Sequence, residues 1–205
     1  MVWDTLIKNA LLFDGRGGAP LERDVAVVDG KVAEVGEGLD AARASEVVDA
    51  AGRWLTPGLW DIHTHLDLEV ELDPGLSEVV RHGTTTAVVA NCSIGVPFGR
   101  QNADGHDPIV SCFARVENIP KSVLERVADK IDWDNPRDYL AHFEAMPLGA
   151  NVVPMIPHSM LRIEAMGLER AISEPSTEDD LQKMESILEE AMKDGYAGFS
   201  TDMLP

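Results

Sequence analysis

The chain has 205 residues, 44% of them hydrophobic, which is enough for one sizeable domain or for a small domain plus part of a larger one. Its 36 acidic and 17 basic residues give a formal net charge of -19. Because this charge repels phosphate backbones and anionic lipid headgroups, we expect neither nucleic acid nor a membrane surface as a partner. The sequence shows no signal peptide and no apolar run of about 18 residues, which predicts a cytoplasmic protein.

The first 55 residues are predicted to form short strands separated by turns. The pair Asp29-Gly30 lies between "VAVV" and "KVAEV". A tight hairpin turn demands such a pair, because both of its central positions need positive φ. We therefore expect a small antiparallel β unit at the start of the chain.

After Pro57-Gly58 the sequence alternates between strand and helix patterns. The expected strands are residues 58–65, 84–92, 150–159 and 196–203, and the expected helices are residues 74–83, 120–131, 135–146 and 176–195. Alternation of this kind predicts parallel pairing with crossover helices. The fold class is therefore α/β, either an open sheet or a barrel.

The expected strand ends carry residues that can bind a metal ion. His63 and His65 end the first strand, and residues two apart in a strand point to the same face. Asn91 and Cys92 end the second strand, and a cysteine thiolate is a strong ligand for zinc. Since α/β folds place their chemistry at the carboxyl ends of strands, His63, His65 and Cys92 are predicted to converge on one cation.

Simpler interpretations exist for each of these residues. A lone pair of histidines two apart is compatible with a structural or surface role. A lone cysteine is compatible with a small buried apolar residue. The position of Cys92 at the end of the neighbouring strand favours the metal interpretation.

Two further residues are candidates for contact with a substrate. His158 ends the third expected strand, where either a substrate contact or a structural hydrogen bond would place a histidine. Asp67 follows the two histidines and is kept as a site residue. Glu69, two residues later, is interpreted as a solvated loop acid.

Four stretches of the sequence together resemble one enzyme family. They are "LTPGLWDIHTHLD", "VVRHGTTTAVVANCSIG", "IDWDNPRDYLAHFEAMPLGANVVPMIPHSMLRIEAMG" and "EDDLQKMESILEEAMKDGYAGFSTDMLP". The first resembles the first barrel strand of the amidohydrolase superfamily, and the set resembles its N-acyl-D-amino-acid deacylases, also called D-aminoacylases. Cys92 gives the resemblance its specificity. Many other amidohydrolases bridge two metals with a carbamylated lysine on the fourth strand, and the fourth expected strand here has no lysine.

The resemblance implies an architecture and a metal site. Residues 57–205 would form about the first four strands of a (β/α)8 TIM barrel, and residues 1–56 would form part of a small N-terminal β-sandwich. His63 and His65 would be ligands of one metal position, with Cys92 as the bridging or shared ligand. The implied cofactor is zinc, as one or two divalent ions.

The sequence departs from the family at two points. The acid that often follows the second histidine directly is replaced by Leu66, with Asp67 next. The family's later histidine ligands and its catalytic aspartate would lie beyond Pro205, so we assign no catalytic base within this chain. A closed barrel needs roughly 250 residues, more than residues 57–205 provide. We therefore expect a complementary C-terminal polypeptide, or the rest of the same chain, to complete the barrel.

The implied activity of the completed enzyme is hydrolysis of the amide bond of an N-acyl-D-amino acid, giving a carboxylate and a free D-amino acid. The 205 residues alone are expected to be inactive. One alternative is another amidohydrolase that acts on cyclic or linear amides. A second is a non-catalytic subunit that needs a complementary chain.

Overall fold

The computed structural model describes residues 2–202, and contacts between residues divide the chain into two compact units after Gly58. The N-terminal unit contains a five-stranded sheet in the order β3-β2-β1-β4, with β5 also paired to β1. These strands are β1 (Trp3–Leu12), β2 (Leu21–Val28), β3 (Lys31–Gly36), β4 (Ala44–Asp49) and β5 (Trp54–Leu55), and a 3₁₀ helix, η1 (Ala41–Arg43), precedes β4.

The expected hairpin of this unit is confirmed, but the wholly antiparallel sheet is wrong. Strands β2 and β3 pair antiparallel around Asp29-Gly30, whose φ angles are 50° and 70°. Strands β4 and β5 instead run parallel to β1. The chain leaves β3 through η1 and joins the opposite edge of β1, a crossover that short strands and turn residues do not reveal.

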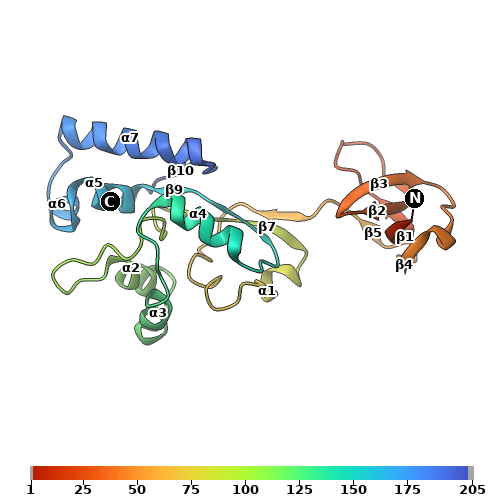
Figure 1. The fold of residues 1–205 in the computed structure, drawn as a ribbon, viewed down its shortest axis with the longest axis horizontal. Helices are drawn as coiled ribbons and strands as arrows, with labels where there is room; N and C mark the ends of the chain where they lie inside the picture. The colour runs from red at the N-terminus through yellow and green to blue at the C-terminus, as the bar shows by residue number, and fades with distance from the viewer. Residues whose placement is uncertain (1, 203–205) are drawn as a thin grey trace. The chain divides into compact units, whose positions relative to one another are not determined.

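The C-terminal unit, from Leu59 onward, contains parallel strands, as expected (Figure 1). Strands β6 (Leu59–Asp61), β7 (Thr84–Val89) and β8 (Asn151–Pro154) form one parallel sheet in that order. Strand β9 (Ile156–Pro157) pairs in parallel with β10 (Phe199–Ser200). Across the described residues the sheets do not close into a barrel.

Each expected strand of this unit is shorter in the structure. The first ends at Asp61, before the two histidines. The third divides at Met155 into β8 and β9, and the fourth contains only Phe199–Ser200. The last residue expected in that strand, Met203, lies outside the described residues.

Seven α-helices are present within residues 59–202, and four of them were expected. Those four are α1 (Ser77–Val80), α3 (Lys121–Ala128), α4 (Pro136–Ala145) and α7 (Glu178–Asp194). The other three, α2 (Pro108–Val116), α5 (His158–Met166) and α6 (Leu168–Ser173), were not expected. No helix among residues 2–202 is both long enough and apolar enough to cross a membrane.

Helix α7 has the best-defined ends. Thr177 and Asp180 form a reciprocal capping box at its start, and Gly195 ends it in the left-handed region at φ 117°. The helix packs against α5 and α4 (Figure 1). Its buried Met184 and Ala191 join the main core, in which Phe113 and Tyr139 are fully buried.

Candidate metal centre

The two histidines lie on an irregular segment that follows β6. Strand β6 ends at Asp61, so His63 and His65 are not strand residues, and the expected strand geometry at these positions is wrong. Thr64, between them, is buried and fixes the segment. Its backbone N–H and its hydroxyl both donate to the carbonyl oxygen of Val88, at 3.2 Å and 2.7 Å. Both imidazoles are thereby held next to the end of β7.

Cys92 lies on a tight turn directly after β7. The turn runs from Asn91 to Ile94, and the Ile94 N–H donates to the Asn91 carbonyl at 3.0 Å. Its central residues, Cys92 and Ser93, have φ angles of 48° and 67°, and Ala90 before them has 63°. A left-handed conformation costs a residue other than glycine roughly 1–2 kcal/mol. Surrounding contacts must therefore stabilise this turn.

Asn91 connects the cysteine turn to the histidine segment. Its side-chain amide donates to the carbonyl oxygens of Val88 and Thr64, at 3.0 Å and 3.3 Å. Because Thr64 separates the two histidines, this hydrogen bond fixes the distance between the imidazoles and the thiol. Asn91 thus acts through its contacts with the backbone.

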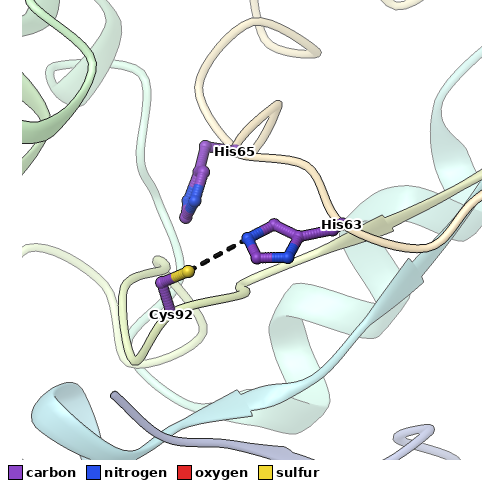
Figure 2. A group of neighbouring side chains, drawn as sticks. All are labelled: His63, His65 and Cys92. Atoms are coloured by element: carbon purple, nitrogen blue, oxygen red, sulfur yellow. Dashed lines mark hydrogen bonds between the residues drawn. The ribbon is translucent and has the colours of Figure 1, made fainter. Parts of the chain in front are cut away.

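The three predicted ligands come together (Figure 2). His63 Nε2 lies 3.0 Å from Cys92 Sγ, and the ring centroids of His63 and His65 are 5.6 Å apart. One ligand atom from each of the three residues lies within 4.8 Å of the other two. A single cation can therefore contact two imidazole nitrogens and one sulfur.

The donor set fits a divalent metal ion. Two imidazoles and a thiolate are ligands that zinc prefers, and a zinc site that acts on a substrate commonly has three protein ligands and an open position. The Nδ1 atom of His65 is buried without a hydrogen-bond partner. Glu117 Oε1 lies 3.9 Å from His65 Nε2, so a carboxylate stands beside the donor set as well.

The protein environment alone does not favour the thiolate. Burial raises the pKa of the Cys92 thiol, and the negative charges of Asp202 and Glu117 raise it further. Cysteine binds a metal ion as the ionised thiolate, and a bound cation deprotonates a coordinating thiol. Ionisation of Cys92 at neutral pH therefore needs a positive charge, which a bound cation supplies.

Asp67 lies beneath the cysteine turn. Its side chain is fully buried, and its Oδ2 atom accepts a hydrogen bond from the Ala90 N–H at 3.2 Å. Burial raises the pKa of this carboxyl to about 7. Gly95 packs closely here, since a Cβ on it would lie 3.0 Å from Asp67 Oδ1. Among the described residues, Asp67 therefore contacts Ala90 and Gly95, which flank the cysteine turn, and its side chain does not reach the surface.

His158 is the first residue of helix α5, so its expected position within the end of a strand is wrong. Strand β9 ends one residue earlier, at Pro157. The His158 Nδ1 atom lies 3.4 Å from the Thr201 hydroxyl, and its ring lies 5.5 Å from that of Phe199. Burial and the nearby charge of Arg162 lower the pKa of His158. A substrate contact by His158 stays a prediction.

Comparisons with known proteins identify the family. A family model described as the amidohydrolase family matches residues 46–204. The chain belongs to the amidohydrolase family. It is 43% identical over 204 residues to an uncharacterized protein of Mycobacterium tuberculosis, covering 98% of this chain and 33% of that protein. It is 30% identical over 200 residues to the N-acyl-D-aspartate deacylase of Alcaligenes xylosoxydans xylosoxydans, covering 97% of this chain and 36% of the enzyme.

A solved structure supports the same relationship. The N-acyl-D-glutamate deacylase of Bordetella bronchiseptica, determined with zinc and a phosphonate inhibitor, superposes with a TM-score of 0.77 at 28% sequence identity. The match covers 98% of this chain and 38% of that one. The resemblance to N-acyl-D-amino-acid deacylases is therefore confirmed. The chain spans about a third of the length of the curated relatives that it matches.

Proposed function

We propose that this chain forms part of a metal-dependent enzyme that hydrolyses the amide bond of N-acyl-D-amino acids. The observation that carries the proposal is the convergence of His63, His65 and Cys92 within 4.8 Å of one another. Membership of the amidohydrolase family and similarity to deacylases of N-acyl-D-aspartate and N-acyl-D-glutamate support the substrate class.

Three residues of this chain would hold the metal. His63 and His65 would contribute imidazole nitrogens, and Cys92 would contribute a thiolate whose negative charge would offset part of the charge of the cation. Zinc, when bound, supplies Lewis acidity that polarises the amide carbonyl and promotes the ionisation of water. Thr64 and Asn91 hold the donors in place through their hydrogen bonds to Val88.

Two residues have proposed roles toward the substrate. His158, at the start of α5, would contact the substrate beside Thr201. Asp67 is fully buried, so any effect of its carboxyl on the substrate would pass through the Ala90 backbone and the cysteine turn. A general base to move the proton to the leaving amine is proposed to lie outside this chain.

We also propose that residues 57–205 belong to the first half of a (β/α)8 barrel and that residues 1–56 belong to a β-sandwich. Four successive parallel strand segments support this arrangement, namely β6, β7, β8 with β9, and β10. The remaining strands would come from a complementary C-terminal polypeptide or from the rest of the same chain. The proposed site is complete, and active, only in that assembly.

The test is a substrate screen with the complete protein. The zinc-loaded protein is expected to hydrolyse N-acyl-D-amino acids in preference to N-acyl-L-amino acids and hydantoins. The Cys92→Ser variant is expected to lose both zinc and this activity, whereas Cys112→Ser, at the other cysteine, retains both. Hydrolysis of hydantoins without action on N-acyl-D-amino acids would refute the proposed substrate. Full activity of Cys92→Ser would refute the metal site.

A further inference from the structure

A second turn, Ala90–Ser93, overlaps the cysteine turn Asn91–Ile94 and is bridged by Ser200, a residue far away in the sequence. The Ser200 hydroxyl donates to the Ala90 carbonyl oxygen at 2.5 Å and accepts from the Ser93 N–H at 3.2 Å. A four-residue turn is usually closed by a direct hydrogen bond from its first carbonyl to its fourth N–H. In the turn Ala90–Ser93, the hydroxyl of Ser200 bridges these two groups instead.

The bridged turn contains the strained residues of the site. Ala90, Cys92 and Ser93 all have positive φ angles, and none of them is glycine. Such a conformation persists only where neighbouring contacts fix it, and it is concentrated at functional sites. Ser200 is itself buried, so its two hydrogen bonds are not exchanged with bulk water.

A second contact fixes the other side of the same turn. The Ser93 hydroxyl accepts from the Ser159 N–H at 2.7 Å and lies 2.8 Å from the Ser159 hydroxyl. Ser159 is in the first turn of α5, where backbone N–H groups have no partner within the helix. Strand β10 and helix α5 therefore each hold one part of the turn.

We infer that Ser200 is a positioning residue for the metal site, which holds Cys92 in a left-handed conformation with its sulfur directed at the two imidazoles. The contact between Ser93 and Ser159 positions the other side of the same turn. Ser200 has no direct contact with the donor atoms of His63 or His65 among the hydrogen bonds of residues 2–202. Its effect on metal binding therefore passes through the backbone of the turn. The inference rests on the metal site of the proposed function.

A purely structural role for Ser200 predicts a different result. Hydroxyls that only satisfy buried backbone groups would change the stability of the fold and leave the affinity of the folded protein for metal unchanged. A positioning role changes metal affinity and the metal–sulfur bond. Residues that orient metal ligands typically alter affinity by about 10–100-fold when they are replaced.

The experiment titrates the metal-free complete protein with Co²⁺ alone and follows the near-ultraviolet absorption of the cobalt–thiolate bond. In Ser200→Ala we expect the dissociation constant for Co²⁺ to rise at least tenfold and the thiolate absorption per bound cobalt to fall. Ser200→Thr keeps the hydroxyl and is expected to restore most of both. The matched control is Thr86→Val, because Thr86 is a buried hydroxyl residue on β7 that contacts Asn151 and not the turn.

Wild-type affinity and absorption in folded Ser200→Ala would overturn the inference. If Ser200→Ala does not fold, Ser93→Ala decides the question, because it removes the contact with α5 and is expected to raise the same dissociation constant. An unchanged dissociation constant in Ser93→Ala would then overturn the inference. Absence of thiolate absorption in the wild-type protein would overturn the metal site itself, whereas lack of deacylase activity with normal cobalt binding would refute only the proposed substrate.

Discussion

Replacement of Cys92 by serine is the most direct perturbation of the candidate metal centre. Structural zinc in zinc-finger peptides is bound with about 10–16 kcal/mol over four ligands, so one ligand contributes roughly 3 kcal/mol. Because ~1.4 kcal/mol is a tenfold change, loss of the sulfur is expected to raise the Kd for zinc about a hundredfold. Without metal the change removes mainly the 3.0 Å contact with His63, which costs about 1 kcal/mol.

Urea unfolding with and without zinc measures this difference. At a zinc concentration about 100 times the wild-type Kd, zinc should stabilise the wild-type protein by ~2.7 kcal/mol and Cys92→Ser by only ~0.4 kcal/mol. Cys112→Ser is the control, because this half-buried thiol is not part of the donor set. Zinc should raise the free energy of unfolding of Cys112→Ser as much as it raises that of the wild-type protein. If zinc stabilised Cys92→Ser as much as the wild-type protein, the sulfur would not be a ligand.

Three further changes test the surrounding structure. Thr64→Val removes the 2.7 Å hydrogen bond to Val88 and should lower the free energy of unfolding in urea by about 1 kcal/mol; no change would show that this bond is dispensable. Hydrogen bonds from Arg170 and Thr177 hold the pKa of the Asp180 carboxyl below its ordinary value of 3.8. The ionised carboxyl therefore stabilises the fold above that pH, and this stabilisation is lost as the pH falls further. Asp180→Asn should therefore flatten the fall of thermal stability below about pH 4, and an unaltered acid profile would contradict this. Gly149→Ala would place a Cβ 2.0 Å from the Gly75 carbonyl oxygen and should lower the free energy of unfolding by roughly 3 kcal/mol, unless the two backbones can separate.

The strongest local signals in the sequence predicted their elements. Asp29-Gly30 identified the hairpin because only a few residue types adopt positive φ at both positions, and the helical pattern of residues 176–195 identified helix α7. Helices α2 and α5 were missed for different reasons. Helix α2 follows a polar loop, and α5 begins at His158 directly after a strand, so no stretch of loop residues marks its start. The parallel pairing of β4 and β5 with β1 depends on contacts between distant residues, which local patterns do not contain.

The chemistry of the site was easier to predict from the sequence than its geometry. The convergence of His63, His65 and Cys92 followed from strand ends in an α/β fold, and the structure brings the three together even though the histidines lie beyond β6. Two residue types at two strand ends were sufficient for this prediction. The residues that hold the donors, Ser93 and Ser200 among them, carry no comparable signal, because serine is common and their contact spans 107 positions of the sequence.

The left-handed turn at Cys92 explains why the sequence predicted the metal-binding residues but not the residues that hold them in place. A regular strand ending would carry the Cys92 side chain onward along β7, whereas positive φ angles at Ala90, Cys92 and Ser93 reverse the chain beside the histidine segment. That reversal costs conformational energy, and hydrogen bonds from β10 and α5 offset it. The turn that carries the proposed ligand Cys92 consequently depends on elements more than 60 positions from Ser93 in the sequence. In the site we propose, the two histidines and the cysteine would supply the atoms that bind zinc, and the buried hydroxyls around the turn would hold those atoms together.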